Sequence, residues 1–237
     1  MKRNYRHVLL LLGLLSLLLI GPRSYAQEIR ESEPLPPFTA LNVEGPVKIE
    51  LIPADENKLQ LMLWDLDERE IRWQVKDNTL YLIARKGLVN KRAYADVKLY
   101  YATLNHINIS GGEVITQEPI QCPHLTLTAE SSIGKMDLIT ECKEITILTS
   151  GDNTVKVRGT TEQASYQAKL GSRIQCLELS AQNVLATASG KAEIQLQVSD
   201  QLDARSVTGA NIFFRGDPVT LNIKKSTLGG VESVNNL

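Results

Sequence analysis

Hydrophobic and polar side chains alternate along most of the chain between residues 38 and 101. Hydrophobic residues fall near every second position in four runs: Leu41, Val43, Val47, Ile49 and Leu51; Leu59, Leu61 and Leu63; Leu80 and Leu82; and Val97, Leu99 and Tyr101. A period of two is typical of half-buried strands, because successive side chains on a strand point to opposite faces. This region is therefore predicted to form several β-strands.

Three polar stretches separate these runs. Asp77-Asn78 lies between two strand-like segments and predicts a hairpin turn. Residues 65–70 are charged and are expected to form a loop or a single helical turn, and residues 85–93 read as an exposed basic loop.

The second half of the chain repeats a short alternating run that ends in a small residue and glycine. The copies are Ile107–Gly111, Leu125–Ala129, Ile145–Gly151, Tyr166–Gly171, Val184–Gly190, Leu202–Gly209 and Leu221–Gly229. The glycines at 111, 151, 171, 190, 209 and 229 are spaced by 40, 20, 19, 19 and 20 residues. Ser131-Ser132 occupies the position of the glycine that the spacing of 40 leaves out.

A period of about 20 residues made of strand-like halves is typical of a β-solenoid. One coil is too short to bury its own apolar face, so coils stack and shelter each other. Glycine suits the corners, where the backbone needs a positive φ or a close approach. The rival interpretation is an antiparallel sandwich with turns every ~8–12 residues, which would not produce such a regular period.

The N-terminus has the features of a secretory signal. Lys2, Arg3 and Arg6 precede a leucine-rich apolar run, and Ser24-Tyr25-Ala26 offers small residues for cleavage after Ala26. The apolar run has 13 residues, fewer than the ~20 that span a bilayer, so an uncleaved anchor is the weaker alternative. We predict a signal peptide at 1–26, a flexible leader at 27–37, an N-terminal β region at 38–103 and the repeating solenoid at 104–237.

Charge narrows the range of partners. Loss of residues 1–26 removes four basic and no acidic residues, which leaves 22 basic and 27 acidic residues and a net charge of −5. Binding to nucleic acid or anionic lipid needs clustered positive charge, so no nucleic-acid partner is expected. No later apolar run is long enough to cross a membrane, so no integral membrane segment is expected after cleavage.

The chain has three cysteines, Cys122, Cys142 and Cys176. Cys122 and Cys142 are 20 residues apart, one coil period, and each lies nine residues before its corner. Stacked equivalents have Cα atoms about 5 Å apart, which a disulfide tolerates. The pair is therefore a candidate inter-coil bridge, with stacked free thiols or two unrelated buried cysteines as alternatives. Cys176 lies within a strand and is interpreted as a small core residue.

No catalytic, cofactor-binding or metal-binding residue is predicted. The acids considered for polysaccharide cleavage are Asp137, Glu141, Glu144 and Asp152, but Asp137 and Asp152 lie at different offsets from their corners and need not converge. Asp152-Asn153 resembles a calcium site only weakly, because calcium-binding repeats place an acid in every coil. His106 and His124 have no partner motif nearby.

Aromatic side chains are the remaining candidates for recognition. Tyr94, Tyr100, Tyr101 and Phe213-Phe214 could form a patch for sugar or protein. Strand alternation, however, turns one ring of each adjacent pair inward.

Five segments of the chain carry a resemblance to a known family: Phe38–Ile49, Val75–Leu82, Leu104–Gly112, Ala188–Ile194 and Val207–Pro218. They resemble the GIN domain family, which is described as the head domain of auto-transporter adhesins. The resemblance covers about residues 38–234, and it implies a right-handed parallel β-helix in the cell envelope or outside the cell.

These observations predict an exported, non-enzymatic, adhesin-like or scaffold protein that presents a β-surface to a protein or glycan. The alternatives are a carbohydrate-active β-helix lyase or hydrolase, and a periplasmic accessory or sensor protein. The expected location is the periplasm, the outer-membrane surface or the exterior. Open coils at the solenoid ends make a homodimer plausible, because they expose strand edges and core.

Overall fold

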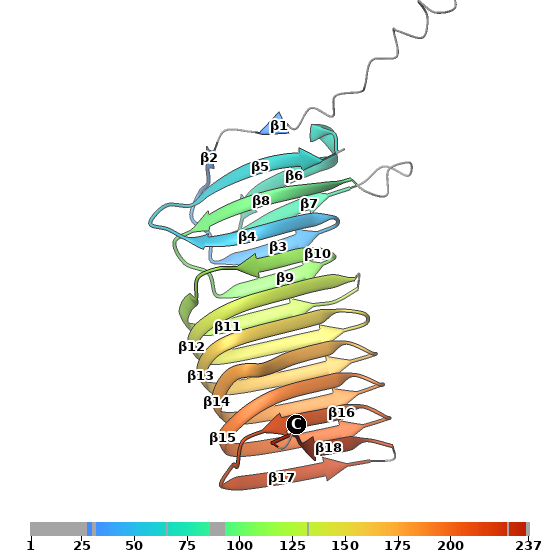
Figure 1. Ribbon diagram of the computed structural model, residues 1–237. Helices are drawn as coiled ribbons and strands as arrows, with labels where there is room; N and C mark the ends of the chain where they lie inside the picture. The colour runs from blue at the N-terminus through green and yellow to red at the C-terminus, as the bar shows by residue number, and fades with distance from the viewer. Residues whose placement is uncertain are drawn as a thin grey trace, which may run out of the picture.

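The computed structural model describes residues 28–29, 32–64, 66–85, 93–131, 133–226 and 228–235. The predicted signal peptide, 1–26, lies outside these residues, as does most of the predicted basic loop at 85–93. The described chain forms a tall stack of β-strands with one short 3-10 helix (Figure 1). The all-β prediction is confirmed.

The solenoid is built from strands that each belong to one of two facing sheets, or that bend from one sheet into the other. They are β9 (His106–Ser110), β10 (Gly112–Thr116), β11 (Ile120–Ala129), β12 (Gly134–Ser150), β13 (Thr154–Lys169), β14 (Arg173–Ser189), β15 (Glu193–Val207), β16 (Asn211–Arg215), β17 (Thr220–Lys225) and β18 (Gly230–Ser233). All pairings among them are parallel. The rival antiparallel sandwich is therefore wrong for this part of the chain.

One coil advances by about 20 residues. Leu125 pairs with Ile145, Ile145 with Ala164, and Ala164 with Val184, which are steps of 20, 19 and 20. In Figure 1 the chain runs along the near sheet, passes a curved edge, returns along the far sheet and closes in a tight turn one level further down. This path is right-handed, as the resemblance implied.

The tight turns carry the predicted positive φ at five of the six repeated glycines. Gly111, Gly151, Gly171, Gly190 and Gly209 have φ between 64° and 97°. At the position without a glycine, Ser131 takes a φ of 73°. The last turn differs, because Leu228 rather than Gly229 has the positive φ. Spacing located the corners, but not which residue of each turn carries the left-handed conformation.

The N-terminal strands continue the same two sheets. They are β1 (Glu28–Ile29), β2 (Glu33–Pro34), β3 (Ala40–Glu44), β4 (Val47–Pro53), β5 (Lys58–Trp64), β6 (Ile71–Lys76), β7 (Thr79–Ala84) and β8 (Tyr94–Tyr101). β3 pairs in parallel with β7 and β9, and β4 pairs in parallel with β8 and β10. The first coil in sequence therefore lies between two later ones, a crossover that no local pattern indicates.

Antiparallel strands close the N-terminal end. β5 pairs antiparallel with β8, and β6 pairs antiparallel with β7 through the predicted Asp77-Asn78 turn, where φ is 50° and 57°. The charged stretch before β6 forms the 3-10 helix η1 (Glu68–Glu70) with a capping box at Asp67. Within the predicted leader, 27–37, β1 and β2 add to the edge of β5.

The core is a continuous column between the two sheets. Inward residues alternate along the strands from β3 to β16, and side chains such as Leu41, Ile107, Ile147 and Ile194 are fully buried. Parallel pairing places each above its equivalent in the next coil, so the coils shelter one another. No helix in the described residues is long and apolar enough to cross a membrane.

The C-terminal end is open. β17 pairs with β15 alone among the described strands, and all six of its residues are exposed. Leu221 and Ile223, which would face the core of a further coil, are 46% and 38% exposed. Among the described residues, the stack is thus covered at its first end and left open at β17 and β18.

Candidate binding groove

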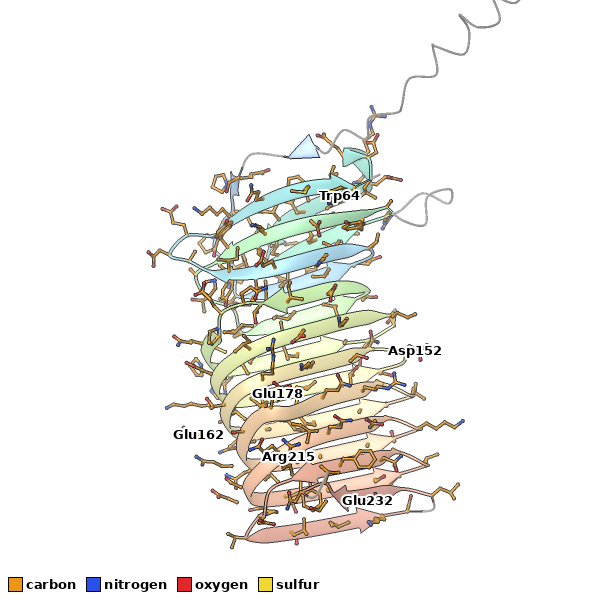
Figure 2. The ribbon with its side chains drawn as sticks, viewed as in Figure 1. Trp64, Asp152, Glu162, Glu178, Arg215 and Glu232 are labelled. Atoms are coloured by element: carbon orange, nitrogen blue, oxygen red, sulfur yellow. The ribbon has the colours of Figure 1, made fainter. Side chains whose placement is uncertain are left out.

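The four acids considered for catalysis do not form a carboxylate pair. Asp137 binds Arg158 at 3.1 Å, Glu141 accepts a hydrogen bond from Gln121 at 2.9 Å, and Glu144 contacts His124 at 2.8 Å. Asp152 lies in a tight turn, on the opposite edge of the stack from Glu162 (Figure 2). Three of the four acids are thus bonded to side chains of the adjacent coil, as surface side chains of stacked coils commonly are.

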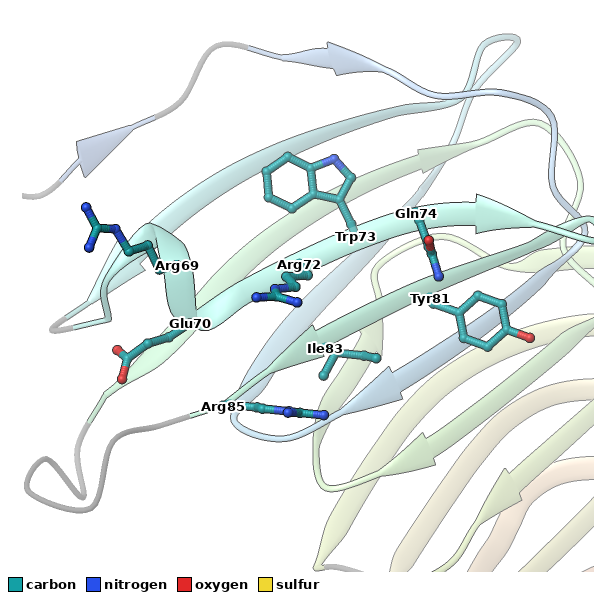
Figure 3. A pocket seen from close by; sticks show the side chains of 8 residues that line it. All are labelled: Arg69, Glu70, Arg72, Trp73, Gln74, Tyr81, Ile83 and Arg85. Atoms are coloured by element: carbon teal, nitrogen blue, oxygen red, sulfur yellow. The ribbon is translucent and has the colours of Figure 1, made fainter.

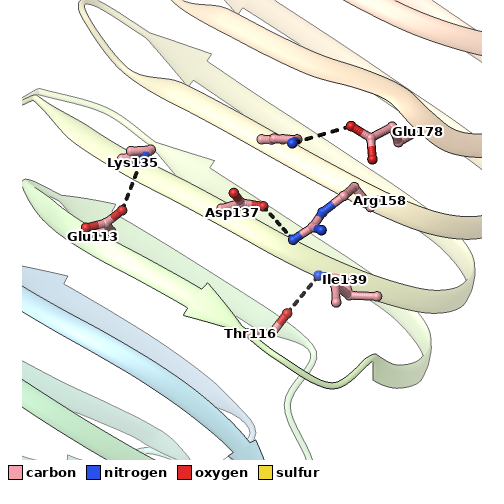
Figure 4. Close-up of polar contacts among 8 residues, drawn as sticks. Glu113, Thr116, Lys135, Asp137, Ile139, Arg158 and Glu178 are labelled. Atoms are coloured by element: carbon pink, nitrogen blue, oxygen red, sulfur yellow. Dashed lines mark hydrogen bonds and ion pairs between the residues drawn. The ribbon is translucent and has the colours of Figure 1, made fainter.

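Two further ion pairs between coils flank the contact of Asp137 with Arg158. Lys135 pairs with Glu113 at 3.0 Å, and Lys156 pairs with Glu178 at 3.4 Å, on either side of the Asp137–Arg158 pair (Figure 4). Such exposed pairs contribute little each, about 0–1 kcal/mol.

The Asp152-Asn153 segment is structural. Asn153 is 1% exposed; its side-chain oxygen accepts a hydrogen bond from the Gly134 amide at 2.7 Å, and its side-chain nitrogen donates to the Ser150 carbonyl at 2.6 Å. His106 lies in β9, opposite Thr126 of the next coil. Within the described ranges, no three His, Cys, Asp or Glu side chains gather closely enough to hold a metal ion.

Cys122 and Cys142 are direct partners in the β11–β12 register, as their spacing predicted. Their sulfur atoms lie 2.9 Å apart as free thiols, and the Thr140 hydroxyl is also 2.9 Å from the Cys142 sulfur. Hydrogen bonds from the Cys122 thiol and from Thr140 lower the pKa of Cys142 to about 6, and the same pairing raises the pKa of Cys122. Whether the pair is bridged remains a prediction.

Cys176 is fully buried, as expected for a core residue. Burial raises the pKa of its thiol to about 12, so it stays protonated and unreactive at neutral pH.

The aromatic residues singled out from the sequence do not form one patch. Tyr101 and Phe214 are buried, at 4% and 6% exposure, which confirms the inward turn of one ring in each pair. Tyr100 lies under the Lys58 ammonium, 5.2 Å from the ring centre. Tyr94 stacks on Trp64 with ring centres 6.0 Å apart, and the Trp64 indole donates to Asp96 at 2.9 Å. Trp64 was not predicted, although alternation with Leu61 and Leu63 places it outward.

The described surface has a groove of about 570 Å³ where η1, β6 and β7 meet. Its lining combines arginines with aromatic and apolar side chains: Arg69, Glu70, Arg72, Trp73, Gln74, Tyr81, Ile83 and Arg85 (Figure 3). None of these residues was singled out as a site from the sequence. The available signal was an outward-facing Tyr81 in a hairpin that begins and ends with arginine.

The hairpin register builds the groove. Gln74 lies opposite Tyr81 and Arg72 opposite Ile83, all on the outer face, while Leu80 and Leu82 point into the core. Trp73 is partly buried against that core. The Arg85 amide donates to the Glu70 carbonyl at 2.7 Å, which fixes the end of β7 beside η1.

Comparison with known proteins gives the family. Residues 37–218 match the family model described as "Putative auto-transporter adhesin, head GIN domain". That span is more than half of the chain. The chain belongs to the GIN domain family. No curated protein matches it.

Solved structures share the GIN-domain fold. A "putative adhesin" of Bacteroides fragilis superposes with a TM-score of 0.81 at 24% identity, over 89% of this chain and 98% of that one. A "putative adhesin" of Parabacteroides merdae has a TM-score of 0.65 at 18% identity, over 88% and 96%. A "Putative lipid binding protein" of Parabacteroides distasonis has a TM-score of 0.66 at 18% identity, over 88% and 97%. These likenesses show the fold alone.

The GIN-domain match includes the whole groove and both stacked cysteines, but it ends before β17.

Proposed function

We propose that this GIN-domain protein is an exported, adhesin-like envelope protein that binds a protein or glycan through its β-surface and catalyses no reaction. The observation that carries the proposal is the groove over β6 and β7, where guanidinium, amide and aromatic groups face outward on a rigid sheet. Such groups recognise a ligand by hydrogen bonding and stacking without chemistry on it. The candidate acids, by contrast, are bonded to neighbouring side chains rather than to each other.

The family description and two of the structures compared above carry the word adhesin, and this supports a surface-binding role. The alternative of a carbohydrate-active enzyme receives no comparable support, because three of the four candidate acids are bonded to non-acidic side chains of the adjacent coil.

The test is binding without turnover. Fluorescently labelled protein is applied to an array of glycans and to intact cells, and captured partners are identified after cross-linking. We expect saturable binding to a subset of targets, with the bound glycan recovered at its original length. Release of shortened or unsaturated oligosaccharides would overturn the non-enzymatic proposal.

Export and location are part of the same proposal. Cleavage after Ala26 predicts a mature chain that begins at Gln27, which N-terminal sequencing of the native protein checks. Digestion of intact cells with an added protease distinguishes a surface location, where the protein is degraded, from a periplasmic accessory or sensor, which is protected.

We also propose that two copies associate through their open C-terminal ends. The unpaired edge of β17 and the exposed Leu221 and Ile223 beside it are the observations that support this association. Its test is given below, at the scale of the whole molecule.

A further inference from the structure

The groove brings together three arginines that have no carboxylate partner among the described residues. Arg69, Arg72 and Arg85 are exposed, and none is ion-paired within the described part of the chain. The single acid of the groove, Glu70, is already engaged, because its carboxylate accepts the Asp67 amide at 3.0 Å in the capping box. The lining therefore concentrates three positive charges against the one negative charge of Glu70, while Asp67 and Glu68, just before Arg69 in the chain, are not lining residues.

This concentration is not a consequence of a basic chain. The residues after position 26 carry a net charge of −5, and three basic residues of the near sheet, Lys135, Lys156 and Arg158, are ion-paired with the coil above or below. A diffuse attraction for polyanions is therefore unexpected. Any anion that binds here is selected by the groove itself.

The shape of these groups indicates the kind of anion. A guanidinium presents a planar fork of donors that matches a carboxylate or sulfate. Tyr81 supplies a flat face of the size of a sugar ring, and Gln74, opposite it in the hairpin, adds an amide on the same outer face (Figure 3). A ring and an amide beside exposed arginines on a sheet surface match alternating sugar rings and acidic groups better than the flexible side chains of an acidic peptide.

We propose that the groove binds an acidic polysaccharide, with its carboxylate or sulfate groups on Arg72 and Arg85 and a sugar ring against Tyr81. Arg69 extends the positively charged side of the groove toward η1. The inference rests on the proposed surface-binding function and names the class of ligand for it.

The groove is held ready before a ligand arrives. Asp67 accepts the Arg69 amide at 2.9 Å, and the Arg85 amide is tied to η1. Arg72 and Tyr81 stand on paired antiparallel strands. Fixed backbone positions reduce the ordering cost of binding.

The test uses the purified protein with polygalacturonate and dextran sulfate as acidic probes, dextran as a neutral probe and polyglutamate as an acidic peptide, by calorimetry at fixed salt. We expect both acidic polysaccharides, or one of them, to bind, with dextran and polyglutamate at least tenfold weaker. The variant Arg72→Gln/Arg85→Gln should weaken binding at least tenfold, and Tyr81→Ser at least threefold. The matched control, Arg205→Gln/Arg215→Gln, removes the same charge from exposed positions near the other end and should change affinity less than twofold.

Circular dichroism and thermal unfolding show that each variant is folded. Equal affinity for polyglutamate, or equal loss in the control variant, would overturn the inference in favour of a general anion or peptide surface. If the protein binds cells or a neutral glycan and the groove variants bind as well as the parent, the inference fails while the proposed function stands. Absence of any target on arrays and cells would overturn both.

Discussion

At the scale of single residues, Cys122 and Cys142 show how stacking changes the chemistry of a side chain. Two thiols 20 residues apart become neighbours 2.9 Å apart because one coil places them in register. The Cys122 thiol hydrogen-bonds to the Cys142 sulfur and favours its ionised form, so the first proton leaves the pair at lower pH than an isolated thiol would allow.

This pair should form a disulfide readily, with a pH dependence set by Cys142. The thiolate is the attacking species, and a pKa lowered to about 6 means that it is populated above that pH and lost below it. We therefore expect the initial rate of bridging by oxidised glutathione to reach half its maximum near pH 6. Intact mass after alkylation counts the remaining thiols.

Cys122→Ala provides the control, because Cys142 should then lose its main stabilising contact and react with iodoacetamide with a midpoint closer to pH 9, its ordinary value. A bridging rate in the parent that rises only above pH 8 would contradict the assignment. So would alkylation of all three cysteines after prolonged oxidation.

Asn153 gives a second prediction at this scale. Its buried amide satisfies the Gly134 amide in one coil and the Ser150 carbonyl in its own. Asn153→Ala leaves both groups buried without these partners, so we expect a loss of about 2–3 kcal/mol in the free energy of unfolding. Urea unfolding measures it.

Asp152→Ala, one position away and exposed, should shift stability by no more than about 0.5 kcal/mol. Equal effects of the two substitutions would show that the hydrogen bonds of Asn153 are not the source of its contribution.

At the scale of elements, the tight turns all use positive φ, but the residues that adopt it differ from turn to turn. Leu170-Gly171, Gly190-Lys191 and Thr208-Gly209 each place two consecutive residues at positive φ, and only one of the two is glycine. Positive φ costs a residue with a Cβ about 1–2 kcal/mol. The turns are therefore strained at Leu170, Lys191 and Thr208.

Leu170 is the clearest case, with a φ of 53° and a side chain that is 69% exposed. Leu170→Asn should stabilise the protein by about 0.5–1 kcal/mol, because asparagine tolerates the left-handed region better than leucine. Thermal unfolding followed by circular dichroism tests this.

Leu185→Asn is the matched comparison, since Leu185 is also an exposed leucine, at 54%, but lies within β14. Asparagine is disfavoured in strands, so this change should be neutral or destabilising. A similar gain in both variants would attribute the effect to reduced surface hydrophobicity instead of turn strain.

At the scale of the whole molecule, the two ends of the stack are unequal. η1 and the antiparallel strands cover the first end, whereas β17 and β18 leave open edges at the last. A two-fold axis that passes through both sheets would pair β17 with β17 of the second copy and β18 with β18, both antiparallel. One symmetry operation would thus extend both sheets and cover Leu221 and Ile223.

We expect the protein to form a dimer in light scattering coupled to size exclusion, and Leu221→Glu/Ile223→Glu to be a monomer at the same concentration. The substituted carboxylates would be buried without partners in the dimer but exposed in the monomer. Leu185→Glu, on the outer face of β14, should remain a dimer. A monomeric parent protein, or a dimer insensitive to the double substitution, would contradict the end-to-end arrangement.

Sequence alone determined what repeats along the chain. Period-two alternation located the strands, glycine spacing located the turns, and the 20-residue interval placed Cys122 beside Cys142, because each is a local or strictly periodic property. These signals sufficed for the solenoid and for the hairpin at Asp77-Asn78.

Tertiary structure decided whatever depends on strands that are not periodic neighbours. β3 and β4 lie between two later coils, antiparallel strands cover the first end, and η1 meets β6 and β7. All three features follow from strand pairings that no regular spacing in the sequence predicts. The groove lies in this irregular part, so only the observed strand pairing shows that its arginines and Tyr81 lie close together. The physical reason is that a repeat places equivalent residues in equivalent surroundings. The end of a stack has no further coil beside it, so its structure depends on which other segments of the chain cover it.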